Sequence, residues 1–244
     1  MLIFSEQEKQ AFGLSEKMLI AYRQDDRDFL LHEDMLDAFK HLQADAAEAG
    51  FLLALASSHR GFERQLAIWN AKAAGKRILY DRNGKVLDYQ SLGKQQLLES
   101  ILCWSAVPGL SRHHWGSDID VFDASAMQLA DVRLIPGEVE GNGPCAAMHE
   151  WLTEKIENNH AHGFFRPYQN NACQVAEEKW HLSYQPVACR YQQYLNADKL
   201  CQLWRQHDMA LIDVLEPVAQ SIIRDYARLD FNRLPDWVGA SSKQ

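Results

Sequence analysis

Short apolar runs and helical hydrophobic patterns alternate along the chain, which shows no internal repeat or low-complexity tract. From His32 to Ala49 apolar side chains recur at helical spacing, and Gly50 supplies the stop. The run 51–56 is continuously apolar and short, which favours a buried strand. Residues 118–122 alternate acidic and apolar side chains as a half-buried strand would, and residues 177–185 also have a strand pattern. These segments predict a small sheet.

Helical patterns cover most of the remaining chain. Ser5 and Glu8 form a capping box that begins a short first helix, and further helices are predicted at 62–74, 94–106, 145–158 and, with interruptions at 196–198 and Pro217, 191–229. Residues 77–89 contain the turn signal Asp-Arg-Asn-Gly and predict a hairpin or an exposed excursion. The pattern therefore predicts an α+β fold whose small sheet carries the polar motifs at its strand ends.

The chain of 244 residues is long enough for one elaborated domain. We divide it into an N-terminal helical segment (1–50) packed on the core, a core (51–190) and a C-terminal helical extension (191–244). The extension either packs on the core or forms the face of a homodimer.

The charge balance excludes some classes of partner. With 33 acidic and 25 basic side chains the net charge is −8, and no basic stripe is present, so nucleic acid is not an expected partner. The N-terminus lacks the basic start and apolar stretch of a secretory signal, and the longest apolar runs are too short to cross a bilayer. We therefore expect a cytoplasmic protein with no membrane partner.

The five cysteines are scattered, and none forms a C-x-x-C pair. This distribution is typical of reduced thiols and argues against a cysteine metal site. Any metal must therefore be held by other ligands.

Polar groups are concentrated in two segments, residues 111–120 (SRHHWGSDID) and 178–184 (EKWHLSY). His113, Asp120 and His181 are candidate metal ligands, and two imidazoles with one carboxylate leave a coordination position open for water, as in catalytic zinc sites. Glu178 lies three residues before His181. On a regular strand these two side chains would not share a face, so we expect a bend or bulge between them.

Two neighbouring residues leave alternatives open. Asp118 would share a strand face with Asp120, so it is either a partner that orients a ligand histidine or an alternative ligand. His114 competes with His113 for the same role.

The two segments read S-x-H-x-x-G-x-x-x-D and E-x-W-H-x-x-Y, and together they resemble the zinc D-alanyl-D-alanine carboxypeptidase family. This family includes vancomycin-resistance-type D,D-carboxypeptidases and related L,D-carboxypeptidases, and it shares its fold with Hedgehog domains. Arg60 and Gln65 match a further family element, so the resemblance spans about residues 51–185. It implies a small antiparallel sheet flanked by helices, with extra helices at both ends.

The resemblance also implies roles for individual residues. His113, favoured over His114 by the motif register, would bind one zinc ion with Asp120 and His181. Glu178 would be the general base and acid, and Arg60 would stabilise the oxyanion. The substrate-binding side chains would be Ser111, Gln65, Tyr184 and Asp118, with packing as the alternative for Tyr184. A small apolar residue is usual in the family where Asp118 stands. Ligands of these types also accept manganese, cobalt or nickel.

Three functions follow from the resemblance. The favoured one is an L,D-carboxypeptidase that trims the terminal D-alanine from murein tetrapeptides during cell-wall recycling, because a cytoplasmic D,D-activity would destroy the cell's own wall precursors. The first alternative is a D,D-carboxypeptidase acting on D-alanyl-D-alanine ends. The second is an inactive zinc-binding recognition module, which is less favoured because Glu178 is present.

Overall fold

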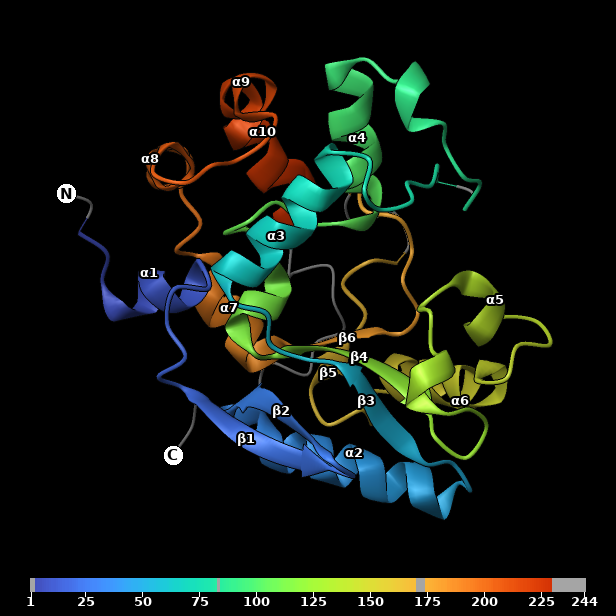
Figure 1. Ribbon diagram of the computed structural model, residues 1–244. Helices are drawn as coiled ribbons and strands as arrows, with labels where there is room; N and C mark the ends of the chain where they lie inside the picture. The colour runs from blue at the N-terminus through green and yellow to red at the C-terminus, as the bar shows by residue number, and fades with distance from the viewer. Residues whose placement is uncertain (1–2, 83, 170–173, 230–244) are drawn as a thin grey trace.

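A four-stranded antiparallel sheet forms the centre of the computed structural model, which describes residues 3–82, 84–169 and 174–229 (Figure 1). Its strand order is β3-β4-β6-β5, with β3 at Leu53–Ser57, β4 at Asp118–Asp123, β5 at Phe164–Phe165 and β6 at His181–Tyr184. Strand β4 therefore has neighbours on both sides, and a bulge interrupts its pairing with β3 between Leu55 and Ser57. The predicted α+β fold with a small antiparallel sheet is confirmed.

A second, two-stranded sheet lies in the N-terminal part that was predicted to be helical. Strands β1 (Leu19–Gln24) and β2 (Arg27–His32) pair antiparallel between helices α1 (Glu6–Ala11) and α2 (Leu36–Glu48). The turn between the strands begins at Asp25, which has a φ of 49°. Aspartate tolerates this left-handed conformation, but without a following glycine it is a weak hairpin signal. The charged run 23–28 therefore hid the hairpin in the sequence.

The other predicted helices are present in order, as α3 (Phe62–Ala73), α4 (Lys94–Trp104), α6 (Ala146–Glu157), α8 (Ala197–Arg205), α9 (Ile212–Leu215) and α10 (Ala219–Ile222), which continues into a π-helical turn at Ile223–Ala227. Helices α5 (Pro136–Val139) and α7 (Gln185–Gln192) are additional to the prediction. Shorter 3-10 turns occupy Glu33–Met35, Tyr89–Ser91, Arg112–Trp115, Leu129–Asp131 and Glu216–Val218. The predicted hairpin at 77–89 is reduced to one bridge between Tyr80 and Val86, and residues 230–244 of the predicted C-terminal extension lie outside the described ranges.

The two largest hydrophobic clusters lie on either side of the central sheet. In Figure 1 the hairpin and α2 form the lower layer, and α3, α4 and α8–α10 lie above the sheet. The lower cluster joins α2 and α6 to the strands through side chains such as Phe39, Leu55 and Leu152, all fully buried. The upper cluster is built around Trp69 and Trp204. The ends of β4 and β6 meet between the two clusters, and the polar motifs lie there.

Strand β4 was predicted to be half-buried, and this was wrong, because all six of its residues are buried. Both of its edges are paired and both of its faces are covered. Its acidic side chains are accommodated by hydrogen bonds; Asp123, for example, accepts from the Leu52 and Ser125 amides, each at 3.0 Å.

The structure describes four of the cysteines, Cys103, Cys145, Cys189 and Cys201, and all four are free thiols; Cys173 lies outside the described residues. Among the described helices, none has both the length and the apolar character needed to cross a bilayer.

Burial of His32 predicts a stability that falls in acid. Its ring is fully buried, with Nε2 3.1 Å from the Tyr191 hydroxyl and Nδ1 accepting from the Asp34 amide at 3.2 Å. Burial lowers the pKa of His32 from 6.5 to about 4, so between these values the unfolded chain binds the extra proton. The free energy of unfolding should therefore fall as the pH drops through this window, by up to about 1.4 kcal/mol per pH unit. Urea unfolding from pH 7 to 4.5 should show a shallower slope for His32→Asn, and the same substitution at exposed His160 is the matched control. An unchanged slope in His32→Asn would contradict this assignment.

Candidate active site

Pairing of β4 with β6 brings the two polar motifs together. Asp120 lies opposite His181 in the register of these strands, and His113 lies in the 3-10 turn that leads into β4. Gly116 ends this turn with a φ of 68°, and a Cβ atom there would lie 2.4 Å from the Leu19 side chain. Glycine adopts this backbone conformation without strain, and a residue with a Cβ atom could not approach Leu19 so closely. The local fold therefore fixes the distance between His113 and Asp120.

The three predicted ligands form a buried triad. The His113, Asp120 and His181 side chains each offer one ligand atom, and these atoms lie within 4.8 Å of one another. His113 Nε2 lies 3.5 Å from Asp120 Oδ2, and His181 Nδ1 lies 3.2 Å from Asp120 Oδ1. The other nitrogen of His113 lies 3.0 Å from the carbonyl oxygens of Ser58 and of Asp118. A hydrogen bond from one ring nitrogen to a carbonyl fixes the orientation of a ligand imidazole, so that its other nitrogen, here His113 Nε2, faces the metal.

The environment of His181 tests whether the triad fits a metal ion. Its Nε2 lies 3.0 Å from Asp118 Oδ1, which leaves Nδ1 facing the triad. Within the described residues, Nδ1 is buried and has no hydrogen-bond partner. Buried polar atoms are seldom left unsatisfied, and a cation bound by the triad would satisfy this one. Two histidines, one carboxylate and an open side are the donor set of a catalytic zinc site, so the residues fit the metal.

The charges around the triad favour a cation. Burial lowers the pKa of His181, but the neighbouring Asp118 and Asp120 carboxylates outweigh burial and raise this pKa to about 9. Burial raises the pKa of Asp120, but His113 and His181 outweigh it and bring this pKa down to about 2. The protein thus stabilises positive charge at this point, and binding of a metal would release the proton.

Asp118 lies behind His181 and does not line the cavity in front of the triad. Its Oδ1 accepts from Arg112 Nε at 2.8 Å, and its Oδ2 accepts from the Ser117 hydroxyl at 2.9 Å. Burial raises the pKa of Asp118, but the attraction of Arg112 and the bond with His181 outweigh burial and keep this pKa well below its usual value. The structure thus places Asp118 outside the cavity lining, hydrogen-bonded to His181, and its predicted contact with substrate stays a prediction. Asp118 is placed to orient His181.

We expect Asp118→Asn to weaken zinc binding about 10- to 100-fold, because an amide cannot fix the His181 ring as a carboxylate does. Competition with a chromophoric chelator measures this affinity. Asp131→Asn, at an exposed position, is the control. Equal affinities in the two variants would remove Asp118 from the metal site.

Glu178 lies in the turn that precedes β6, not on the strand itself. The His181 amide donates to the Glu178 carbonyl at 3.1 Å, and the Glu178 amide donates to the Tyr168 carbonyl at 3.2 Å. The turn places Glu178 Oε2 3.7 Å from His181 Nδ1. The predicted strand at 177–185 was therefore too long, and of the expected bend or bulge between Glu178 and His181 the structure has the bend, in this turn. Burial, with help from Asp120, raises the pKa of Glu178 to about 7, against the opposing effects of His181 and Arg60.

Arg60 and Ser111 line the cavity as predicted substrate-contacting residues would, but Gln65 does not. Arg60 donates to Gln65 Oε1 at 3.1 Å and to the Ser57 hydroxyl at 3.3 Å. Gln65 is fully buried and donates to the Ala106 carbonyl at 2.7 Å. Gln65 therefore holds the Arg60 guanidinium, and its predicted contact with substrate stays a prediction that this placement does not support.

Tyr184 is also absent from the cavity lining. It lies three positions after His181 on β6, so its side chain is on the opposite face of the strand. Its ring packs on Phe164 with centroids 5.4 Å apart. This placement favours the packing alternative for Tyr184, and its predicted role in substrate binding stays a prediction.

His114, the alternative to His113, points away from the triad. Its Nδ1 lies 2.5 Å from the Arg60 carbonyl, and its Nε2 accepts from the Gly109 amide at 3.0 Å. His114 thus fixes the backbone at Arg60 and does not take part in the triad.

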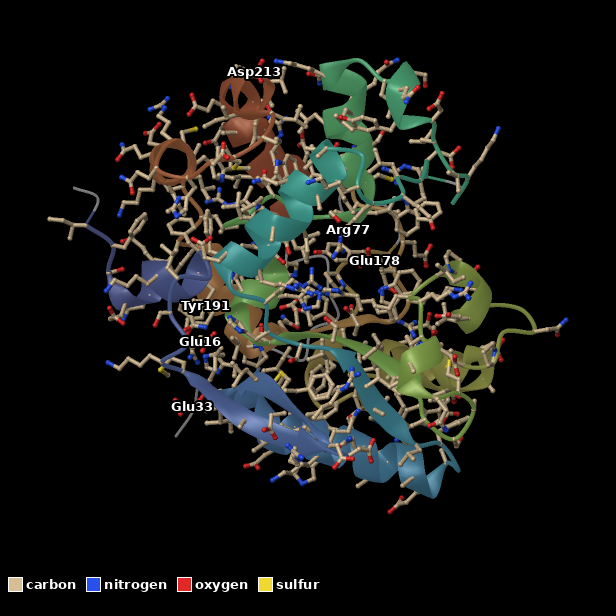
Figure 2. The ribbon with its side chains drawn as sticks, in the orientation of Figure 1. Glu16, Glu33, Arg77, Glu178, Tyr191 and Asp213 are labelled. Carbon is tan, nitrogen blue, oxygen red and sulfur yellow. The ribbon has the colours of Figure 1, made fainter. Side chains whose placement is uncertain are left out.

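The cavity in front of the triad has a volume of about 1040 Å³, and the lining residues that sequence reasoning missed include Tyr168 and Lys72. The Tyr168 ring lies 4.8 Å from the His181 ring, and no sequence signal indicated it. Lys72, half-buried on α3, donates to the Ser105 hydroxyl at 2.5 Å. Its spacing of seven residues from Gln65 puts both on one face of the helix, and this signal was available. Figure 2 shows Glu178 between the helices above it and the α5 segment at its right.

Comparison with known proteins agrees with this geometry. Residues 28–187 match the family model described as VanY, D-alanyl-D-alanine carboxypeptidase. An uncharacterised Haemophilus influenzae protein is 47% identical over 77 residues, or 32% of this chain, and the match spans about half (53%) of that relative's length. A second uncharacterised protein of the same organism is 30% identical over 130 residues, covering 52% of this chain and 95% of the relative. The solved structure of VanYB in complex with D-alanine-D-alanine matches the fold with a TM-score of 0.50 and 18% identity, covering 81% of this chain and 88% of that one.

Proposed function

Because the chain belongs to the VanY family of D-alanyl-D-alanine carboxypeptidases, we propose that it is a zinc metallocarboxypeptidase that removes the terminal D-alanine from peptidoglycan peptides. The observation that carries the proposal is the buried triad of His113, Asp120 and His181, with Glu178 3.7 Å from the unsatisfied His181 nitrogen. When bound, zinc activates water and polarises the scissile carbonyl.

Glu178 is suited to move the proton in this reaction. A general base works best with a pKa near the working pH, and burial brings the pKa of Glu178 to about 7. Its carboxylate would accept a proton from the attacking water and then give it to the amine of the departing D-alanine. The turn before β6 holds it at the cavity wall throughout, because its backbone is tied to Tyr168 and to His181.

Arg60 is suited to stabilise the negative charge that develops on the carbonyl oxygen. Its guanidinium lines the cavity and is held from behind by neutral partners, Gln65 and Ser57, so its charge remains available to a ligand. Fixed donors of this kind stabilise an oxyanion without reorganising. Ser111, on the same wall, would contact the peptide.

Our finer proposal is that the enzyme is an L,D-carboxypeptidase acting on murein tetrapeptides during recycling in the cytoplasm. In a tetrapeptide the residue before the scissile bond has a long charged side chain, whereas in a pentapeptide it is D-alanine. The cavity volume of about 1040 Å³ and the half-buried Lys72 beside Glu178 support the longer side chain. The family description supports the alternative, D,D-cleavage of D-alanyl-D-alanine ends.

A mass-spectrometric time course with zinc-loaded protein tests the proposal. Murein tetrapeptide and pentapeptide are supplied side by side, and we expect tetrapeptide to lose one D-alanine while pentapeptide persists. Loss from pentapeptide alone would establish the D,D-activity instead. Loss from neither, with zinc confirmed as bound, would favour a recognition module without activity.

A further inference from the structure

The cavity in front of the triad is cationic, although the chain as a whole is acidic. Its lining includes five basic side chains, namely Arg60, Lys72, Lys76, Arg77 and Arg133. The lining carboxylates are Asp120 and Glu178, which the triad and the proton transfer already use. Over the whole chain acidic residues exceed basic ones by 33 to 25. A positively charged cavity in a negatively charged protein indicates that the cavity binds an anionic ligand.

The basic side chains extend from the reaction centre to the cavity mouth. Lys72 is half-buried and close enough to Glu178 to lower its pKa, and Arg77 lies close enough to Lys72 to lower the Lys72 pKa. Lys76, Arg77 and Arg133 are exposed at the mouth. In the view of Figure 2 Arg77 lies on the side of α3 and α4, above Glu178. We call Lys72, Lys76, Arg77 and Arg133 the cationic lining, and leave Arg60 to the oxyanion.

The charges at the mouth have no anionic partner within the described ranges. No described carboxylate lies within 4.0 Å of the charged groups of Lys76, Arg77 or Arg133. Single exposed cations such as Arg27 are also without such a carboxylate among the described residues, but here three of them line one cavity. Three unpaired cations around one cavity repel each other and cost stability, so their position is explained if a ligand supplies the negative charge.

Arg133 is presented by a constrained turn. The Arg133 and Leu134 amides both donate to the Glu138 carboxylate, at distances of 2.9 to 3.2 Å. Leu134 has a φ of 55°, a left-handed conformation that costs energy for a branched side chain. Such strain persists only where the surroundings fix it. Glu138 thus holds the turn, and with it the backbone of Arg133, at the cavity wall.

We infer that the cationic lining selects stem peptides that have an extra carboxylate on the residue before the scissile bond, as diaminopimelate has and lysine lacks. This inference rests on the proposed function and specifies its substrate. Diaminopimelate is lysine with one further carboxylate on the terminal carbon of its side chain, so one negative charge is the main difference that the cationic lining can recognise. The terminal carboxylate is common to all the peptides and cannot discriminate. Hydrogen bonds between arginine and a carboxylate are among the stronger polar contacts and lower KM when they form on binding.

The test compares two tetrapeptides, L-Ala-γ-D-Glu-X-D-Ala, with X either meso-diaminopimelate or L-lysine, hydrolysed by the zinc-loaded full chain. We expect kcat/KM to favour the diaminopimelate peptide by about tenfold or more, a typical effect of one charge-assisted contact. In the double variant Arg77→Gln/Arg133→Gln this ratio should fall toward one, mainly through KM for the diaminopimelate peptide. Arg27→Gln, an exposed arginine outside the cavity, should keep the wild-type ratio.

A salt titration tests the same inference with wild-type protein, so its result does not depend on whether the double variant folds. Because Arg77 and Arg133 are exposed, their attraction is screened, and the preference should shrink between about 0.05 and 0.5 M NaCl. Equal hydrolysis of both peptides, or a preference that survives both the double variant and high salt, would overturn the inference while leaving the carboxypeptidase in place. If zinc-loaded protein releases D-alanine from neither peptide, the proposed function fails and the inference fails with it.

Discussion

Replacing Glu178 by glutamine is expected to lower the rate of D-alanine release by about 10²- to 10⁴-fold, the usual contribution of a positioned general base. The amide keeps the shape of the side chain but cannot accept a proton from water or return one to the leaving amine. The position of Glu178 depends on backbone hydrogen bonds to Tyr168 and His181, which the substitution leaves in place. The loss should therefore appear in kcat, and zinc content measured by emission spectrometry should be unchanged.

Glu177→Gln is the matched control, because the neighbouring side chain is exposed and absent from the cavity lining. It makes the same chemical change one residue away and should leave the rate near that of wild type. A Glu178→Gln variant that retains zinc and turns over normally would remove Glu178 from the mechanism. Zinc loss in that variant would indicate instead that Glu178 is needed to hold the metal.

Arg112→Met should destabilise the metal-free protein by about 3–5 kcal/mol, the cost of leaving one member of a buried ion pair without its partner. Arg112 is 1% exposed, and besides Asp118 it donates to the Ser183 hydroxyl at 2.7 Å. Its guanidinium also lies over the Trp115 ring, 4.6 Å from the centroid. Methionine preserves part of the apolar contact, so the loss measured by urea unfolding reports mainly the uncompensated Asp118 charge.

Two further variants identify the cause of this loss. Arg112→Met/Asp118→Asn removes both charges and should recover much of the lost stability, because the cost lies in the unpaired carboxylate. Lys94→Met breaks the exposed pair with Asp213 and should change the stability by no more than about 1 kcal/mol. If the double variant is no more stable than Arg112→Met, the loss comes from packing against Trp115 and not from charge.

The sequence was informative where a function or an element requires particular residue types at a particular spacing. The metal triad was predicted because two histidines and an aspartate at this motif spacing are the residue types that a catalytic zinc ion needs, and antiparallel pairing of β4 and β6 brings Asp120 opposite His181. The main helices were predicted because their apolar faces repeat at helical spacing. The hairpin at β1 and β2 was missed because its turn uses an aspartate in a left-handed conformation within a charged run.

The roles of residues around the triad depended on contacts that the sequence does not show. Asp118, Gln65 and Tyr184 were all expected to contact substrate, yet each lies behind or beside the cavity wall. Which of two polar neighbours faces the cavity depends on strand pairing and on the ring placed between them, as with Asp118 and His181. Tyr168 and Arg133 lie outside the motifs and join the site only through the tertiary fold.

The most direct test of a one-zinc carboxypeptidase is a titration of chelator-treated protein with zinc, followed by D-alanine release from murein peptides. We predict no release without metal, and a rate that rises in proportion to added zinc and reaches a plateau at one ion per chain, the capacity of a single triad. His181→Ala should show neither the tight binding nor the activity. Full release by metal-free protein, or a plateau at two ions per chain, would contradict the account.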